Sequence, residues 1–331
     1  MGDWEPRRCA RMTPERSLMV FSGRGNPELG HKVAAKIGIE LGDVEVTTFA
    51  DGEIYVKYGE SIRGADVFII QSTCRPVNDN LMELLIMVQA ARLASAHRVT
   101  AVVPWMGYSR QDKKSRPREP ITARLVADIM QAAGVDRVVT MDLHAGQLQG
   151  FFGVPVDHMT ALPVIADYFK LKGLGDLVVV SPDAGGLKTA KRVADRLDCS
   201  VAVLTKLRPE HNVSRVMHVI GDVDGKTAII VDDVIDTAGT LVNGVQACLD
   251  KGARRVYAAC THPVLSDPAY ERIAASPLEE CVVTDTIPLQ EGADLTKIVV
   301  LSTAGILADT IKNVFADESV SELFQGENQL F

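Results

Sequence analysis

The sequence has no apolar run that approaches the roughly 20 residues of a membrane-spanning helix. Residues 1–16 contain four arginines and no apolar segment, so we expect no signal peptide there. We expect a disordered tail instead; a transit peptide is a weaker alternative, because Asp3, Glu5 and Glu15 are acidic. No low-complexity region or close internal repeat occurs along the chain. We therefore expect a globular protein without a membrane segment.

Cysteine patterns that build disulfide frameworks or zinc sites are also missing. The chain has six scattered cysteines and no C-x-x-C pair: Cys9, Cys74, Cys199, Cys248, Cys260 and Cys281. This usage is typical of reduced thiols in the cytosol. We therefore expect a cytoplasmic protein without a structural metal.

Two common nucleotide-binding motifs fail on inspection. Gly23-Arg24-Gly25 lacks the correctly placed third glycine of a dinucleotide fingerprint. The Gly221–Lys226 stretch has three residues between its glycines, not four, and precedes a strand, so it is not a Walker A loop. A formal net charge of −8 and a pI near 5.4 further argue against a general nucleic-acid binder.

What the chain does contain is a regular alternation of short β-branched runs and stretches with helical spacing. Its 331 residues, 47% of them hydrophobic, suffice for two domains of ordinary size. We predict strands at 18–21, 44–49, 54–57, 67–70, 99–103, 137–141, 177–180, 201–204, 216–220, 228–231, 256–260, 281–283 and 298–300. We predict complete helices at 80–94, 121–133, 269–274 and 304–315. Two further helices begin at residues 27 and 241, and another ends near residue 197. Residues 150–157 are the expected crossover between the two halves. Both halves therefore read as parallel α/β units.

The stretch 227–240 carries the most specific chemistry. A buried strand, Ala228–Val231, leads into Asp232 and Asp233, and then into the small-residue segment Asp236–Thr240 at a helix start. Successive N–H groups and hydroxyls at a helix N-terminus bind phosphate, and carboxylates at a strand's carboxyl end accept from ribose hydroxyls. A solvated acidic turn is the alternative. The combination favours a site for a phosphorylated sugar.

Three other strand ends carry candidate groups. Asp142 and His144 alternate after one strand and together favour a divalent cation, although a lone histidine is usually structural. Asp183 stands before a glycine-rich turn. The basic loop 108–120 suits a polyphosphate or is merely solvated, and the two interpretations are even from that segment alone. The polar segment 205–212 is predicted to be mobile.

The 227–240 stretch resembles the 5-phosphoribosyl 1-diphosphate (PRPP) loop of the type I phosphoribosyltransferase fold. With the motifs at 49–53, 78–85, 107–112, 142–144, 181–186 and 206–212, residues 17–324 resemble the PRPP synthetases, the ribose-phosphate diphosphokinases of the phosphate-activated class. The resemblance implies an α/β fold of two phosphoribosyltransferase-like domains, each a mainly parallel sheet flanked by helices. Their implied bounds are 17–157 and 158–316, with a C-terminal tail at 317–331.

The resemblance also implies roles for individual residues. ATP would contact Phe49, Asp51, Gly52 and Glu53, across a subunit contact, and Arg110 and Gln111. Mg²⁺ would be held by His144 and Asp183. Ribose 5-phosphate would contact Arg208, Asp232, Asp233, Asp236, Thr237, Ala238, Gly239 and Thr240. Lys206 and Arg208 would be catalytic. Leu207 departs from the family, which often has a third cation there.

The implied reaction transfers the diphosphoryl group of Mg–ATP to the C1 hydroxyl of ribose 5-phosphate, giving PRPP and AMP for nucleotide, histidine and tryptophan biosynthesis. The resemblance further implies activation by phosphate, inhibition by ADP at an allosteric site, and a homo-oligomer, namely a hexamer. Two alternatives stay open at this point: a PRPP-consuming phosphoribosyltransferase, and a catalytically silent regulatory subunit. The first would lack the ATP segments, and the second should have lost loop cations or metal ligands.

Overall fold

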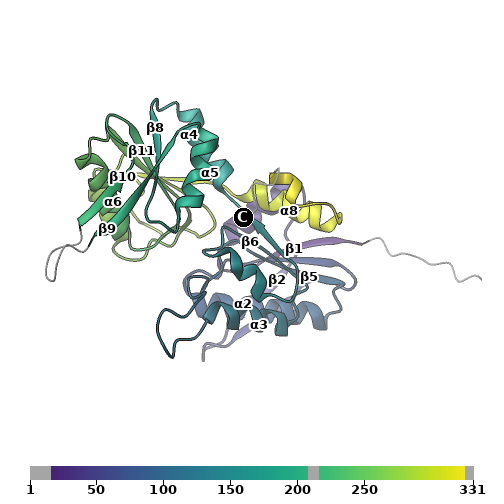
Figure 1. Cartoon of the computed structure of the whole chain (residues 1–331). Helices are drawn as coiled ribbons and strands as arrows, with labels where there is room; N and C mark the ends of the chain where they lie inside the picture. Colours follow the sequence, from purple (N-terminus) through teal and green to yellow (C-terminus); the bar gives the residue numbers. More distant parts are fainter. Residues whose placement is uncertain (1–15, 208–215, 325–331) are drawn as a thin grey trace, which may run out of the picture.

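The structure, a computed structural model, describes residues 16–207 and 216–324. Figure 1 shows two α/β units, one formed by the purple and blue first half and the other by the teal and green second half. The C-terminal helix α8 (Ala304–Phe315), in yellow, lies with the first unit. The predicted fold class, two phosphoribosyltransferase-like domains with mainly parallel sheets, is confirmed.

The first sheet is wholly parallel and has the order β1-β4-β5-β6-β7. Its strands are β1 (Leu18–Ser22), β4 (Asp66–Ile70), β5 (Arg98–Val103), β6 (Arg137–Met141) and β7 (Val156–Met159). A separate antiparallel hairpin joins β2 (Val44–Thr48) to β3 (Ile54–Tyr58). Parallel pairing puts the carboxyl ends of the five sheet strands on one edge, where α/β sheets bind ligands.

The second sheet has seven strands in the order β10-β9-β8-β11-β12-β13-β14. Only the β10–β9 pair is antiparallel. The strands are β8 (Leu177–Ser181), β9 (Ser200–Leu207), β10 (Val216–Ile220), β11 (Thr227–Ile235), β12 (Arg255–Pro263), β13 (Glu280–Thr284) and β14 (Ile298–Leu301). β11 lies at the centre of this sheet, so its carboxyl end has neighbours on both sides.

Helices cover both faces of each sheet. They are α1 (Pro27–Ile37), α2 (Val77–Leu93), α3 (Thr122–Ala133), α4 (Leu162–Lys172), α5 (Leu187–Leu197), α6 (Gly239–Asp250), α7 (Ala269–Ala275) and α8, with 3₁₀ turns η1 (Gly146–Phe151) and η2 (Ser321–Phe324). Helices α2 and α3 bury one face of the first sheet, and α6 and α7 one face of the second. The remaining faces share one apolar cluster with α1, α4, α5 and α8, so the two sheets are held together by a common core.

Most predicted elements occur within a few residues of their expected bounds. Helix α2 begins at Val77 and not at residue 80. Strand β7 and helix α4 were not predicted. β7 pairs with β6, and it includes residues 156 and 157, which were predicted to be the end of the crossover. The prediction that β11 ends at Val231 is wrong, because pairing with β12 continues to Ile235 and includes Asp232.

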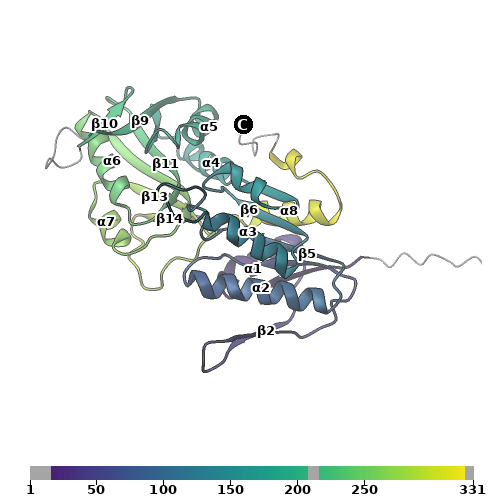
Figure 2. The ribbon, with the colours of Figure 1, turned by 60° about the horizontal axis from the view of Figure 1, so that its bottom comes forward.

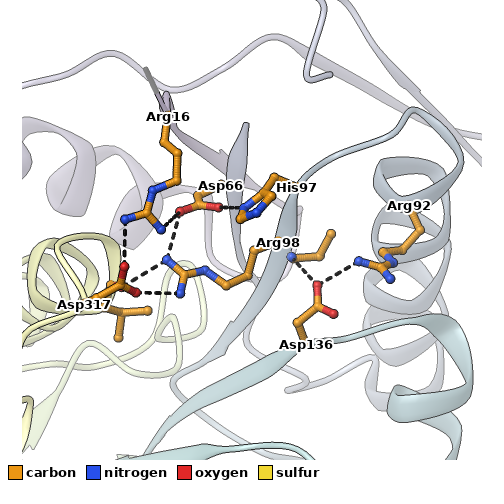
Figure 3. Close-up of polar contacts among 9 residues, drawn as sticks. Arg16, Asp66, Arg92, His97, Arg98, Asp136 and Asp317 are labelled. Carbon is orange, nitrogen blue, oxygen red and sulfur yellow. Dashed lines mark hydrogen bonds and ion pairs between the residues drawn. The ribbon is translucent and has the colours of Figure 1, made fainter. Parts of the chain in front are cut away.

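A polar cluster ties the end of the chain to the first sheet (Figure 3). Asp66, with 1% of its side chain exposed, contacts Arg98 at 2.8 Å, His97 at 2.8 Å and Arg16 at 3.5 Å. Asp317, just after α8, pairs with both Arg16 and Arg98. The charges of the buried Asp66 are thereby compensated, and helix α8 is fixed against α1 and the first sheet.

The failed G-x-G motif has a packing explanation. A Cβ at Gly23 would lie 2.5 Å from Gln71 Oε1 and 2.8 Å from Glu83 Oε1, and one at Gly25 would lie 2.4 Å from the Ser72 carbonyl. Glu83 is buried and accepts from the Arg24 backbone and guanidinium at 2.6 Å. The glycines thus make room for a buried polar cluster.

Candidate active site

The carboxyl edges of the two sheets face each other, and direct hydrogen bonds join them. The Ser72 hydroxyl donates to the Thr286 carbonyl at 2.6 Å, and Asn26 Nδ2 donates to the Asp285 carbonyl at 2.8 Å. These contacts are buried and bring together strand ends from both halves. Strand ends of the two halves that carry predicted site residues therefore meet at one junction.

The predicted sugar-phosphate loop follows β11 and opens helix α6. Ala238 adopts the left-handed conformation, with φ +57°, and α6 begins at Gly239 without a side-chain cap. Arg272, on α7, donates from Nη1 to the Thr237 carbonyl at 2.8 Å. The uncapped N–H groups at this helix start form the kind of site that binds phosphate.

Asp232 and Asp233 form a closely coupled pair in the last part of β11. The Asp233 amide donates to Asp232 Oδ1 at 2.9 Å. Burial, the hydrogen bond to Asp233 and the charge of Asp233 raise the pKa of Asp232 to about 8. Burial would raise the pKa of Asp233 as well, but hydrogen bonds from His144 and Asp232 hold it below its usual value. Burial and the neighbouring carboxylate therefore favour the protonated form of Asp232 over that of Asp233.

His144 reaches across from the first half to this pair. Its Nδ1 lies 2.7 Å from Asp233 Oδ2, and this hydrogen bond raises the pKa of His144. Asp142 turns elsewhere, since its Oδ2 accepts from the Ala161 amide and the Thr261 hydroxyl. That Asp142 and His144 hold a cation together stays a prediction.

Asp183 lies on an exposed turn before α5. Its Oδ1 accepts from the amides of Gly185 at 2.8 Å and Gly186 at 3.0 Å, and its charge contributes to the raised pKa of Asp232. Within the described ranges no group of three or more His, Cys, Asp or Glu side chains forms a metal cage. Mg²⁺ commonly takes one or two protein ligands and completes its shell with water and substrate phosphates. His144 contacts Asp233, and the charge of Asp183 acts on Asp232, so each of the two predicted ligands lies near a carboxylate of β11.

Arg110 connects the predicted ATP segment to the sugar-phosphate loop. Its Nη1 lies 2.7 Å from Asp236 Oδ2, and hydrogen bonds from Ser266 and Arg110 hold the pKa of Asp236 down although burial would raise it. A cavity of about 1010 Å³ opens beside this pair, lined by Arg110, Gln111 and further residues of both halves, from the segments 74–79, 105–111, 264–270 and 287–290. The site is thus built from both halves.

The tip of the β2–β3 hairpin lies apart from these groups. Figure 2 shows the hairpin projecting from the first unit. The Phe49 side chain is 53% exposed and packs on Tyr55, with ring centroids 5.8 Å apart, and Gly52 closes the turn at φ +95°. Among the described residues, none of the predicted ATP contacts at the tip lines the cavity.

The predicted catalytic pair falls largely outside the described part of the chain. Arg208 lies outside it. The backbone of Lys206 belongs to β9 and pairs with Met217. The catalytic roles of both residues remain predictions.

Comparisons with known proteins agree with this arrangement. The N-terminal domain of ribose phosphate pyrophosphokinase matches residues 18–134, and the phosphoribosyl synthetase-associated domain matches residues 205–325. A ribose-phosphate pyrophosphokinase of Fusobacterium nucleatum is 54% identical, and one of Caldanaerobacter subterraneus 55% identical; each match covers 93% of this chain and 98% of the relative. The chain belongs to the ribose-phosphate pyrophosphokinase family.

A solved structure of the family agrees with the fold. The phosphoribosylpyrophosphate synthetase from Mycobacterium smegmatis superposes with a TM-score of 0.87 at 45% identity, over 91% of this chain and 100% of the other. In the described ranges no helix has the length and apolar character needed to cross a membrane. Family membership confirms the resemblance that the separated motifs predicted.

The structure adds residues that sequence reasoning did not single out. Arg272 holds the sugar-phosphate loop, and Thr261 and His262 contact the turn that carries His144. Thr261 and His262 lie in the last part of strand β12, which was predicted to end at residue 260. A prediction that extended the strand past residue 260 would have identified them as polar residues at a strand's carboxyl end. Nothing local distinguishes Arg272, because its partner lies 35 residues away in sequence.

Proposed function

We propose that this member of the family is a ribose-phosphate diphosphokinase. It transfers the diphosphoryl group of ATP to the C1 hydroxyl of ribose 5-phosphate, with PRPP and AMP as products. One observation carries the proposal: strand β11 and the sugar-phosphate loop that follows it are joined, by His144–Asp233 and Arg110–Asp236, to the two segments assigned to metal and ATP. A diphosphoryl transfer requires this meeting of two substrate sites.

Ribose 5-phosphate is assigned to the carboxyl end of β11. The amides from Asp236 to Thr240, with the hydroxyls of Thr237 and Thr240, bind the 5-phosphate at the start of α6. Asp232 and Asp233 accept from the ribose hydroxyls and fix the ring. The C1 hydroxyl then faces the junction of the two halves, where it attacks the β-phosphorus of ATP.

ATP is assigned to Arg110, Gln111 and the hairpin tip. Arg110 lies beside the sugar-phosphate loop, so its guanidinium is suited to the polyphosphate. His144 and Asp183 would hold Mg²⁺, which neutralises charge on the phosphate oxygens. Lys206 and Arg208 are proposed to stabilise charge that builds on the transferred group.

A PRPP-consuming phosphoribosyltransferase is the first rival. It needs one phosphoribosyltransferase-like domain and a base-binding region, whereas this chain carries two such domains and its residues 18–134 match the N-terminal domain of ribose phosphate pyrophosphokinase. A silent regulatory subunit is the second rival. His144, Asp183, Lys206 and Arg208 are all retained in the sequence, which favours activity.

Purified protein incubated with ATP, Mg²⁺ and ribose 5-phosphate tests the proposal. We expect AMP and PRPP to appear in equal amounts. Formation of ADP, or release of AMP without PRPP, would contradict it. Incubation with PRPP and free purine or pyrimidine bases tests the transferase alternative, for which release of diphosphate would be the positive result.

We further propose that the protein works as a homo-oligomer, a hexamer, in the cytoplasm. The exposed Phe49 and its hairpin support a subunit contact, because the tip does not reach the cavity of its own chain. Sedimentation analysis tests the hexamer. Activation by phosphate and inhibition by ADP follow from the resemblance, and initial rates at varied phosphate and ADP test them.

A further inference from the structure

The turn that carries His144 is held by groups from outside its own strand. Asp142, its first residue, has a left-handed backbone with φ +33°. Asp142 Oδ2 accepts from the Thr261 hydroxyl at 2.6 Å and from the Ala161 amide at 2.8 Å, and the Leu143 amide donates to His158 Nε2 at 2.8 Å. A non-glycine residue with positive φ is held at an energetic cost, so these contacts oppose relaxation of the turn.

His262 contacts the same turn from the neighbouring position on β12. Its ring is 1% exposed, and Nε2 lies 3.1 Å from the Met141 carbonyl and 3.2 Å from the Asp142 carbonyl. Burial lowers the pKa of His262, which favours the neutral ring. A neutral ring that donates from Nε2 accepts at Nδ1, where the Thr286 hydroxyl lies 3.0 Å away. The ring is therefore fixed at both nitrogens.

Two of the groups that hold the turn, Thr261 and His262, belong to the second sheet, whereas the turn, His158 and Ala161 belong to the first half. β11 and β12 are adjacent, with Val234 opposite His262. β11 supplies Asp233, which contacts the His144 ring. β12 supplies Thr261, which donates to the Asp142 carboxylate, and His262, whose Nε2 lies beside the Met141 and Asp142 carbonyls. The side chain of His144 and the two residues before Leu143 are thus contacted by the same pair of strands that carries the proposed sugar site.

We propose that Thr261 and His262 are positioning residues that orient the His144 turn of the first sheet against the sugar site of the second. This inference rests on the proposed function, in which His144 serves Mg–ATP. Neither residue touches substrate in this assignment. They act by keeping the His144 imidazole in place, since metal and phosphate binding depends on groups that are already oriented before the ligand arrives.

Thr261 offers a clean test because valine has the same shape without the hydroxyl. Thr261→Val removes a short hydrogen bond to a carboxylate; we expect the KM for ATP and the Kd for Mg²⁺ with α,β-methylene-ATP to rise about tenfold. The KM for ribose 5-phosphate should change less than about twofold. Thr261→Ser keeps the hydroxyl and should restore values close to the wild type.

A merely structural role is separated by a matched control. Thr284 is equally buried, lies 2.6 Å from the Thr261 carbonyl and 3.2 Å from the Thr286 hydroxyl, and in the described part of the chain makes no direct hydrogen bond with the turn. Thr284→Val should lower the melting temperature as Thr261→Val does and leave the KM for ATP unchanged. Equal changes in KM for the two valine variants would overturn the proposal. If Thr261→Val does not fold, Thr261→Ala is compared with Thr261→Ser in the same way.

A double-mutant cycle with His144→Ala decides whether Thr261 acts through His144. We expect Thr261→Val to have almost no further effect on Kd for Mg²⁺ with α,β-methylene-ATP once His144 is alanine. Fully additive effects would contradict the proposal. If the wild-type protein makes PRPP and Thr261→Val has a normal KM for ATP and Kd for Mg²⁺, the positioning role alone is refuted. If the wild-type protein makes no PRPP, the proposed function is refuted.

Discussion

Arg110 and Asp236 form an ion pair of 2.7 Å although 126 positions separate them in the sequence. Arg110 belongs to the segment assigned to ATP, and Asp236 to the loop assigned to ribose 5-phosphate. Both side chains are partly exposed, at 43% and 31%, so the pair contributes little to stability. Its significance is positional, because the pair lies where the two proposed substrates meet.

Arg110→Ala is expected to weaken both substrates. We expect the KM for ATP to rise by at least about tenfold through loss of a phosphate contact, and the KM for ribose 5-phosphate to rise less, through a freed Asp236. Steady-state kinetics with each substrate varied in turn measures the two effects. Lys113→Ala, in the same exposed basic loop, serves as the control and should change both KM values by less than about twofold.

Substitutions of the two carboxylates of β11, Asp232 and Asp233, should affect the KM values of the two substrates differently. Asp232→Ala is expected to raise the KM for ribose 5-phosphate about tenfold and that for ATP much less. Asp233→Ala should also raise the KM for ATP, because Asp233 holds the His144 ring. Identical profiles for the two variants, measured by steady-state kinetics, would contradict the assignment of Asp232 to the sugar.

Arg272 should support the sugar-phosphate loop from outside. Arg272→Ala removes the donor to the Thr237 carbonyl, next to the left-handed Ala238. We expect the KM for ribose 5-phosphate to rise about threefold to tenfold, with the melting temperature almost unchanged because the side chain is exposed. Arg272→Lys should recover part of the loss. An unchanged KM for ribose 5-phosphate in the alanine variant would show that the loop keeps its conformation without Arg272.

Lys206→Ala tests the catalytic segment predicted from sequence. We expect kcat to fall at least about 10²-fold, by analogy with losing one donor of an oxyanion hole, while both KM values and the melting temperature change little. Arg208→Ala should resemble it, with an added loss of ribose 5-phosphate affinity. Rapid-quench and steady-state rates measure the effect, and a near-normal kcat for Lys206→Ala would remove this residue from the mechanism.

Asp66→Asn tests the polar cluster of Figure 3. Its side chain is 1% exposed and faces Arg98 and His97, so we expect the free energy of unfolding to fall by about 3 kcal/mol. Urea denaturation measures the loss. Asp317 pairs with the same arginine, but its side chain is about half exposed. Asp317→Asn should therefore lower the free energy of unfolding much less. Equal losses in the two variants would mean that burial of Asp66 is not the cause.

The sequence predicted most of the strands that surround the site, because short β-branched runs followed by Asp, Gly or Pro are strong local signals. It failed where the signal was not local. The end of β11 was misplaced since two consecutive aspartates read as the end of a strand, yet pairing with β12 carries the strand on to Ile235. Strand β7 was missed because Val156-Asp157-His158-Met159 alternates only weakly, and its partner β6 defines it.

The sequence by itself determined the family, the α/β class and the candidate residues of each half, because these depend on residue type and spacing along the chain. Only the tertiary structure decided which of them meet. It joined His144 to Asp233, Arg110 to Asp236 and Asp142 to Thr261, and it brought His262 and Arg272 into the site. Each of these relationships depends on how the carboxyl edges of two sheets face each other, and the shared apolar core between the sheets sets that arrangement.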